Sequence, residues 1–404
     1  MRVPVGWKTV IHSAPSTTST RAGRYRRSSA SGGEEVWAFG PSRLPPSPPL
    51  ALSGALAGKL GRAMHALGRL DAVGSLLPDP GLFLYMYVRK EAVLSSQIEG
   101  TQSSLSDLLL HEAAVAPGVP IGDVEETSAY VHALGHGLAE LRREGGLPLC
   151  VRLLRDMHRI LLEHGRGTNR QPGAFRTTQN WIGGTRPGNA VFVPPPWEEV
   201  EPAVADLERY LNGPEQPLVK AAVAHAQFET IHPFLDGNGR VGRQLITLVL
   251  CAESVIEQPL LYLSLYLKEQ RDAYYAHLMR VRHDGAWEGW LEFFLDGVIE
   301  TAATAAATTV EIRTLIDRDR ARILASPAPT TRLRLFEELT ARAIISDLPG
   351  LARRLGVSPQ TGYNAIGSLV SLGIARELSG QRRRRVWAYD EYLAILAAGT
   401  EPRA

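Results

Sequence analysis

One short run, residues 231–243 with the sequence IHPFLDGNGRVGR, constrains the fold of this chain more than any other. Gly237 and Gly239 can adopt positive-φ conformations, so successive backbone N–H groups can turn inward and form an anion-binding nest. The residues that follow the nest have the pattern of a helix, whose N-terminus also attracts anions. The run therefore predicts a phosphate-binding loop that leads into a helix.

The side chains of this run suit phosphate chemistry. Arg240 and Arg243 are three residues apart on the predicted helix, so both guanidinium groups lie on one face and suit a polyphosphate. Asp236 is placed to hold Mg²⁺, which binds through one or two carboxylates together with phosphate oxygens. His232 has an unperturbed pKa near neutrality and is the candidate base for an incoming hydroxyl. Phe234 is expected to pack inward and to fix the loop.

Two other interpretations of the run are weaker. The letters GNGRVG also match the dinucleotide-binding pattern G-x-G-x-x-G, but that motif needs a preceding strand and a βαβ unit. The preceding segment, Leu218 to Glu229, has the composition of a helix. His225 and Glu229 can be drawn as metal ligands together with His232, but a hydrogen-bonded helical histidine is the favoured interpretation of His225.

The run HPFLDGNGRVGR resembles the signature of the Fic (Fic/Doc) family, H-P-F-x-[D/E]-G-N-G-R-x-x-R, with every fixed position present. Most members of that family are protein adenylyltransferases. The resemblance implies transfer of AMP from ATP to a Ser, Thr or Tyr hydroxyl of target proteins or of the enzyme itself, with release of pyrophosphate. Transfer of UMP, phosphate or phosphocholine is left open, because an anion nest does not distinguish these groups.

The resemblance also implies a role for each signature residue. His232 would take the proton of the target hydroxyl, and Asp236 would hold Mg²⁺ on the α- and β-phosphates of ATP. The residues expected to bind the phosphates are Gly237, Asn238, Gly239, Arg240 and Arg243.

The likeness extends to two further segments. Gly173 to Pro196 contains GAFR, QNWIGG and FVPPP, aromatic and β-branched residues around Gly-rich turns that are typical of a β-hairpin. It resembles the family's flap, which aligns an extended target segment by strand pairing. The predicted target-docking residues are Gln179, Asn180, Trp181, Ile182, Gly183 and Gly184. Ser264 to Met279 resembles the helical segment after the signature, which makes Tyr274 and Tyr275 candidate adenosine contacts; core packing is the alternative for either.

A motif upstream of the signature indicates regulation. Ser95-x-x-x-Glu99-Gly100 resembles the inhibitory motif [S/T]-x-x-x-E-[G/N] of the same family. Helical spacing places Ser95 one turn before Glu99, so the hydroxyl is expected to steady the carboxylate. In the family this glutamate pairs with the second signature arginine, here Arg243, and occupies the donors for the γ-phosphate. We therefore expect auto-inhibition by a helix in the N-terminal part of the chain; removal of AMP with the help of Glu99 is left open.

The C-terminal part resembles a winged helix-turn-helix. Leu351 to Pro359 has the apolar spacing of a short helix, a Gly turn, and a Ser N-cap with Pro at the first position of the next helix. Ser358 to Leu372 is the expected recognition helix, and Arg376 to Tyr389 the expected wing. Its tip carries candidate nucleic-acid contacts, Arg382, Arg383, Arg384 and Arg385. A solvated charge run and a protein-docking module are the alternatives to DNA binding.

The expected fold is mostly α: a Fic-type helical core with a short β-hairpin flap, plus the C-terminal winged helix-turn-helix. The predicted divisions are a disordered basic tail (1–33), an N-terminal helical region with the inhibitory helix (34–125), the Fic catalytic core (126–300), a helical linker (301–334) and the winged helix-turn-helix (335–398). The tail is rich in Ser, Thr and Gly and has no acid before Glu34. An organellar transit peptide is the alternative for it.

Bulk properties add limits. The formal net charge of +2 is nearly balanced, so a nucleic-acid role must depend on the local arginine run. Two cysteines without metal-ligand spacing predict a reducing, cytoplasmic location. The most apolar long stretch, Leu245 to Leu263, is interrupted by Glu253 and Glu257, so no membrane span is expected. Homodimerisation is left open.

Two hypotheses from different classes follow. The first is an auto-inhibited protein adenylyltransferase with ATP as co-substrate and Mg²⁺ as cofactor. The second is a nucleotide-sensing, DNA-binding regulator with vestigial catalysis. The intact His232 favours the enzyme, because a degenerate sensor has no need for a base at the nest.

Overall fold

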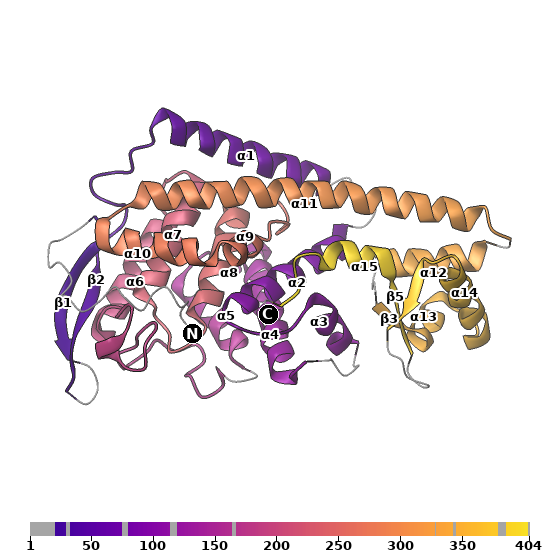
Figure 1. Cartoon of the computed structure of the whole chain (residues 1–404), viewed down its shortest axis with the longest axis horizontal. Coiled ribbons are helices and arrows are strands. Elements are labelled where there is room, and N and C mark those ends of the chain that lie inside the picture. The colour runs from indigo at the N-terminus through magenta and orange to yellow at the C-terminus, as the bar shows by residue number, and fades with distance from the viewer. Residues whose placement is uncertain are drawn as a thin grey trace.

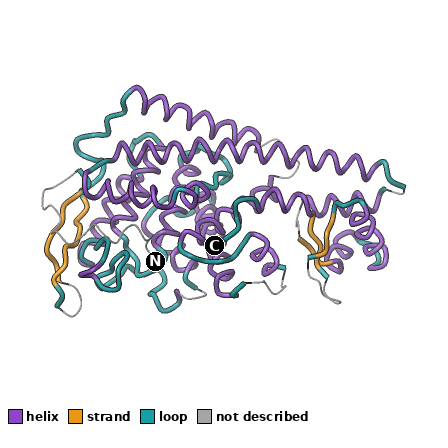
Figure 2. Tube along the Cα trace, viewed as in Figure 1, coloured by secondary structure: helices purple, strands orange, loops and turns teal. Residues whose placement is uncertain are grey.

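The structure, a computed structural model, describes residues 21–29, 33–74, 80–113, 119–163, 167–327, 329–341, 345–378 and 385–402. Helices dominate it, as predicted, and strands occur only at its two ends (Figures 1 and 2). None of the helices in the described ranges is long and apolar enough to cross a membrane.

The longest helix, α11 (Trp287–Leu324, 38 residues), runs along the length of the molecule, and α1 (Gly54–Gly74) lies beside it (Figure 1). The buried residues of α1 recur at intervals of three, four or seven, which places them on one face. That face packs on α11. The predicted division at residue 300 is wrong, because α11 continues through it without a break, with buried side chains on both sides.

The core is built around α7 (Pro217–Ile231) and α8 (Asn238–Ala252), which pack against each other. Apart from its first residue, α7 is buried all round, as expected for a helix enclosed by others. The helices packed against this pair are α2 (Pro80–Ile98), α4 (Ile121–Arg142), α5 (Val151–Leu161), α6 (Val200–Leu211), α10 (Arg271–Asp284) and α11. Two shorter helices, α3 (Leu105–Glu112) and α9 (Ser264–Glu269), pack on α2. The predicted division at 125 falls within α4.

An N-terminal hairpin of β1 (Gly23–Ser29) and β2 (Glu35–Pro41) corrects the prediction of a disordered tail for residues 23–29. Residues 1–20 and 30–32 lie outside the described ranges. In β1 a buried Tyr25 lies between exposed Arg24 and partly buried Arg26, so the segment alternates in strand fashion. Average composition hides such an alternation. The backbone N–H of Phe39 donates to the carbonyl of Val193 at 2.9 Å, which joins the hairpin to the predicted flap.

The flap itself departs from a regular hairpin. Within the described residues it is a loop with one antiparallel bridge, Ile182 to Phe192, and one short 3-10 helix, η3 (Pro187–Asn189). A second 3-10 helix, η4 (Trp197–Glu199), follows the flap. Prolines lack the N–H that a ladder requires, and Gly183 and Gly184 have φ of 69° and 72°, so pairing stops after the bridge.

The C-terminal region follows the predicted order of helix, turn, helix and hairpin. Its elements are α12 (Thr330–Ala341), β3 (Ile345–Asp347), α13 (Leu348–Leu355), α14 (Pro359–Ser371), β4 (Ala375–Glu377) and β5 (Val386–Tyr389). The strands form an antiparallel sheet in the order β3-β5-β4. Gly356 has φ 65° in the turn, and the hydroxyl of Ser358 accepts from the N–H of Thr361 at 3.1 Å, as the cap prediction required. A last helix, α15 (Asp390–Ala397), leads back towards α2 (Figure 1).

Candidate active site

The loop between α7 and α8 is held in a defined shape. His232 ends α7 in the left-handed conformation (φ 50°, ψ 60°), and its N–H donates to the carbonyl of Phe228 at 2.9 Å. Phe234 is fully buried, as predicted, and stacks on the ring of His158 with centroids 3.7 Å apart. Gly237, with φ 75°, begins α8. The backbone thus turns twice by positive φ, which directs the start of α8 towards the cavity that this loop borders.

Asn238 has a different role from the one predicted. Its side-chain oxygen accepts from the N–H of Phe234 at 2.9 Å, and its nitrogen donates to the carbonyl of Phe234 at 2.8 Å. The side chain is 2% exposed. Both polar ends are therefore used to close the loop, so Asn238 shapes the anion site and its side chain is not directed at a phosphate.

A cavity of about 380 Å³ opens in front of this loop. Its walls come from the loop between α7 and α8, the flap, α4, α10 and the turn that follows α2. The lining residues include Glu99, Glu126, Asn180, Trp181, Ile182, Phe192, Glu229, His232, Asp236, Gly237, Asn238, Gly239, Arg240, Tyr275 and Arg282. The volume lies in the range of small-molecule sites. Most of the predicted site residues line this one cavity. The exceptions are Ser95, Arg243, Tyr274, Gln179, Gly183, Gly184 and the arginine run.

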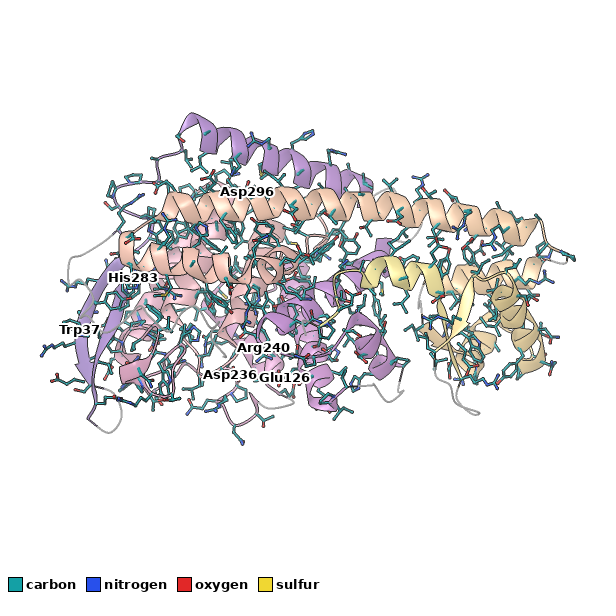
Figure 3. The ribbon with its side chains drawn as sticks, in the orientation of Figure 1. Trp37, Glu126, Asp236, Arg240, His283 and Asp296 are labelled. Carbon is teal, nitrogen blue, oxygen red and sulfur yellow. The ribbon has the colours of Figure 1, made fainter. Side chains whose placement is uncertain are left out.

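Asp236 and Arg240 border the cavity beside Glu126 (Figure 3). The Arg240 guanidinium lies 3.4 Å from the Glu126 carboxylate and 3.9 Å from that of Asp236. One carboxylate oxygen of Asp236 accepts from the N–H of Gly237 at 2.7 Å, and the side chain is about half exposed. In the described part of the chain, no three His, Cys, Asp or Glu side chains form a metal cluster. A single open carboxylate at a phosphate site nevertheless fits Mg²⁺, which takes its other ligands from phosphate and water.

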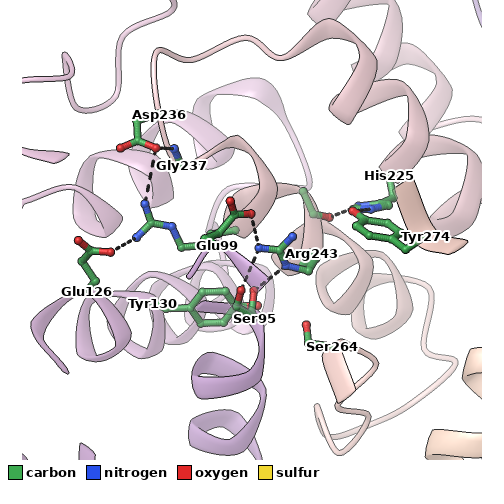
Figure 4. Close-up of polar contacts among 12 residues, drawn as sticks. Ser95, Glu99, Glu126, Tyr130, His225, Asp236, Gly237, Arg243, Ser264 and Tyr274 are labelled. Carbon is green, nitrogen blue, oxygen red and sulfur yellow. Dashed lines mark hydrogen bonds and ion pairs between the residues drawn. The ribbon is translucent and has the colours of Figure 1, made fainter. Parts of the chain in front are cut away.

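Arg243 lies behind the cavity and is bound by residues of the predicted inhibitory motif (Figure 4). Its Nη2 donates to Glu99 at 2.8 Å and to the carbonyl of Ser95 at 3.1 Å, while its Nε donates to the Ser95 hydroxyl at 2.7 Å. Ser95 therefore contacts the arginine, where the sequence had suggested that it would steady Glu99. The Arg243 side chain is 1% exposed, and Glu99, at 24%, stands between it and the cavity.

The charges in the site follow from these contacts. Burial alone would raise the pKa of Glu99, but the adjacent Arg243 guanidinium outweighs it and holds the pKa below its usual value. Burial, helped by Arg176 and Arg282, lowers the pKa of His232 to about 3. The imidazole is therefore neutral at pH 7 and able to accept a proton. A bound polyphosphate would offset the two arginines and make this base stronger.

The two tyrosines on α10 differ. Tyr275 lines the cavity, as predicted for an adenosine contact. The prediction that Tyr274 contacts adenosine is wrong, because its side chain is fully buried in the core. Its hydroxyl lies 2.9 Å from Nε2 of His225. His225 Nδ1 lies 2.8 Å from the carbonyl of Gly242, so the imidazole is satisfied on both sides and is not a metal ligand.

The predicted docking residues divide into supports and exposed groups. Gln179 donates to the carbonyl of Pro194 at 3.0 Å within the flap. Asn180 donates to the carbonyl of Phe234 at 2.9 Å and so joins the flap to the loop between α7 and α8. Trp181 is 38% exposed at the mouth of the cavity, and Ile182 forms the bridge. Gly183 and Gly184 form the turn that follows.

Three buried residues of the site escaped the sequence analysis. Arg176 donates to carbonyls of His232, Pro195 and Thr178, and so clamps the flap to the loop. Arg282 lies 3.9 Å above the ring of Phe192 and donates to the carbonyl of Glu229 at 3.0 Å. His158 accepts from Gly173 N–H at 2.8 Å and contacts the Asp236 carbonyl at 3.1 Å. Apart from Thr178, the partners named here are at least 15 positions away in sequence, so no local pattern marks these three residues.

Arg382, Arg383 and Arg384 lie outside the described residues. Arg385 is exposed and lies 3.7 Å from Glu377, the last residue of β4. The predicted nucleic-acid contact therefore stays a prediction.

Fold and site together define a class: helical proteins with a Gly-Asn-Gly anion loop between two core helices and a nucleotide-sized cavity in front of it. Two family models match the chain, "Fic/DOC family N-terminal" over residues 57–139 and "Fic/DOC family" over residues 148–250. Residues 57–139 and 148–250 are therefore the two domains of the Fic/DOC family in this chain.

Curated relatives carry the name protein adenylyltransferase. The match to fic-1 of Caenorhabditis briggsae is 30% identical over 174 residues, 42% of this chain and 31% of the relative. The match to Fic of Drosophila grimshawi is 27% identical over 154 residues, 37% of this chain and 29% of the relative. The chain thus spans about a third of the length of these relatives. A crystal structure of a Fic family protein from Desulfovibrio desulfuricans G20 superposes with TM-score 0.53 at 20% identity, covering 84% of this chain and 97% of that one, which confirms the fold.

Proposed function

We propose that this protein is an auto-inhibited protein adenylyltransferase, which transfers AMP from ATP to a hydroxyl side chain of target proteins and of itself. The observation that carries the proposal is the convergence of His232, Asp236, Arg240 and the backbone of Gly237–Gly239 on one cavity. The names of the curated relatives support the same activity.

The arrangement of these residues supports a separate role for each of them in the reaction. The neutral imidazole of His232 takes the proton as the target oxygen attacks the α-phosphorus, and pyrophosphate leaves. The N–H groups at the start of α8 and the guanidinium of Arg240 hold the phosphates. Asp236 would hold Mg²⁺, which supplies positive charge to the phosphate oxygens when bound. Tyr275 borders the space left for the nucleoside, and the flap offers the backbone edge beside Ile182 to an extended target segment.

Inhibition is assigned to Glu99. The Arg243 guanidinium gives three of its five N–H donors to Glu99 and Ser95, so at most two are left for a γ-phosphate. The carboxylate would also repel the terminal phosphate of ATP. In this proposal the resting protein admits ATP only in a pose that the base cannot use.

The experiment uses full-length Glu99→Gly and Glu99→Gly/His232→Ala proteins with Mg²⁺ and ATP, CTP, GTP or UTP labelled at the α-phosphate. The expected result is protein-bound label from ATP in the first protein, weaker label in the unmodified chain, and none in the double variant. Label that survives the loss of His232 would contradict its role as base. No label from any nucleotide would favour the nucleotide-sensing regulator.

A further inference from the structure

The end of the chain returns to the inhibitory motif. Gln97, two residues before Glu99, donates from Nε2 to the carbonyl of Thr400 at 2.7 Å and to the carbonyl of Ser103 at 2.8 Å. Thr400 is 1% exposed. The side-chain amide of Gln97, in the last turn of α2, thus binds both Ser103, in the segment after Glu99, and Thr400, which is 303 positions away in sequence.

A second buried side chain holds the same tail. Lys268 of α9 donates to the carbonyls of Gly399 at 3.1 Å and Glu401 at 2.8 Å. Lys268 is 6% exposed, and α9 packs on α2. The carbonyl groups of the three tail residues Gly399–Glu401 are therefore bound by two helices. One is α2, which carries Ser95 of the inhibitory motif, and the other is α9, which packs on α2.

The tail is a direct extension of the C-terminal module, residues 335–398. α15 follows β5 without a loop and contacts α2, α3 and α11 (Figure 1). The end of β5 and the start of α15 are anchored on α11: Tyr389 of β5 donates to the buried Asp319 at 2.9 Å, and Glu391 of α15 pairs with Arg318 at 2.6 Å. A change in how the module sits on α11 would therefore move the tail.

The turn that carries Glu99 depends on few contacts of its own. The N–H groups of Glu99 and Thr101 both donate to the carbonyl of Ser96, at 3.0 and 3.3 Å, and the N–H of Gly100 donates to the carbonyl of Gln97 at 3.1 Å. Gly100 has φ 105°, and its carbonyl accepts a weak bond of 3.4 Å from the side chain of Gln102. The side chain of Gln97 bridges the helix before this turn to Ser103 after it. Loss of the Gln97 contacts would free the turn to open, and opening would draw the Glu99 carboxylate away from Arg243.

We propose that Gly399–Glu401 is a latch by which the C-terminal module keeps Glu99 on Arg243. Its link to activity rests on the proposed function, while its link to the turn does not. Because the latch consists of a few hydrogen bonds, each of small net value, a ligand that shifts the module can open it. The C-terminal module is then the input that governs the catalytic site.

Two substitutions test the latch from opposite sides, each with a matched control in the full-length protein. Gly399→Ala strains a residue with φ 79°, and the added methyl carbon meets Leu265 at 3.0 Å. Gly373→Ala puts the same strain, at φ 69°, into the same module where nothing lies within 4 Å. Gln97→Ala removes the donor to Thr400 and to Ser103. Its control, Gln360→Ala, changes an exposed glutamine of α14 whose side chain donates to Asn364.

Deuterium exchange of the amides at 96–101, measured without nucleotide, reports on the turn. We expect Gly399→Ala and Gln97→Ala to speed this exchange about fivefold, the effect of roughly one lost hydrogen bond, and the controls to leave it unchanged. Equal exchange in all four variants, or acceleration by the controls as well, would overturn the latch whatever the activity of the protein.

AMP self-labelling reports on the catalytic consequence. We expect about fivefold more label in the two latch variants and no further increase when either is added to Glu99→Gly. An increase of the same size in the Glu99→Gly background would overturn the link to Glu99. If Glu99→Gly itself takes no label, the proposed function fails, and the exchange result alone decides the latch.

Discussion

Glu99 and Arg243 meet at 2.8 Å across 144 positions of sequence, and the same guanidinium binds the hydroxyl and the carbonyl of Ser95. The pair is nearly closed to solvent on the arginine side and faces the cavity on the glutamate side. A buried arginine held this way keeps its charge, and the carboxylate that holds it blocks access to that charge.

Arg243→Lys, introduced into Glu99→Gly, should lower AMP self-labelling at least about tenfold. An ammonium cannot reproduce the fork that guanidinium offers to phosphate oxygens. The measurement is the rate of labelling as a function of ATP concentration, and Arg313→Lys, an exposed change on α11, is the control. Equal rates for the lysine variant would show that Arg243 does not bind phosphate.

Asn238→Ala should lower the free energy of unfolding by about 1–3 kcal/mol without any nucleotide present, because it leaves the N–H and carbonyl of Phe234 unpaired in a buried loop. Urea unfolding of the two proteins measures the difference. A side chain that only gripped phosphate would leave the unfolding of the nucleotide-free protein unchanged, and such a result would refute the role given to Asn238 here.

Asp236→Asn should abolish the dependence of labelling on Mg²⁺ and reduce the rate at least about a hundredfold, with little change in thermal stability. The amide oxygen can still accept from the N–H of Gly237, so the loop is kept while the negative charge is lost. A Mg²⁺ titration of both proteins in the Glu99→Gly background checks this. An unaltered Mg²⁺ titration would remove Asp236 from the metal site.

His225 makes stability depend on pH. Burial lowers its pKa from 6.5 to about 3, so the unfolded chain takes a proton that the folded chain refuses, and stability falls as the pH drops below 6.5. Between pH 7.5 and 5.5 this histidine should account for a loss of about 1.4 kcal/mol. His225→Gln keeps a donor and an acceptor but cannot titrate, so its unfolding free energy should fall by that much less over the same interval. If the unfolding free energies of the two proteins changed equally with pH, the result would contradict a neutral, buried His225.

Much of the candidate site was predictable because its residues are close together in the sequence. The residues from His232 to Arg243 occupy one loop and the first turns of one helix, and a positive-φ glycine and helical spacing act over a few residues. Of the two glycines expected to allow the turn, Gly237 has a positive φ, whereas Gly239 lies within α8. The helix-turn-helix order of the C-terminal region followed from the Ser358 cap and the Gly356 turn for the same reason. The winged-helix function and its arginine contacts stay predictions.

Other features were mispredicted because they depend on distant partners. Asn238 and Tyr274 lie in motifs that suggest ligand contact. In the structure, however, the side chain of Asn238 bonds to Phe234 of the same loop, and the hydroxyl of Tyr274 bonds to His225 in the core. The β1–β2 hairpin forms in a segment whose composition suggests disorder, because β2 can bond to the flap. The predicted helical linker at 301–334 is helical at 301–324, but it is not a separate segment, because α11 begins at Trp287.

The sequence by itself predicted the chemistry, because one short run holds a histidine, an acid, a glycine-rich loop and two arginines, which together suit a phosphate site. Tertiary structure decided which of these groups are available. Arg243 is covered by Glu99, Asn238 is used by the loop, and Gln97 is joined to Thr400 across the whole chain. Local spacing is encoded in backbone geometry, whereas the competition among buried donors and acceptors is settled only when the helices pack.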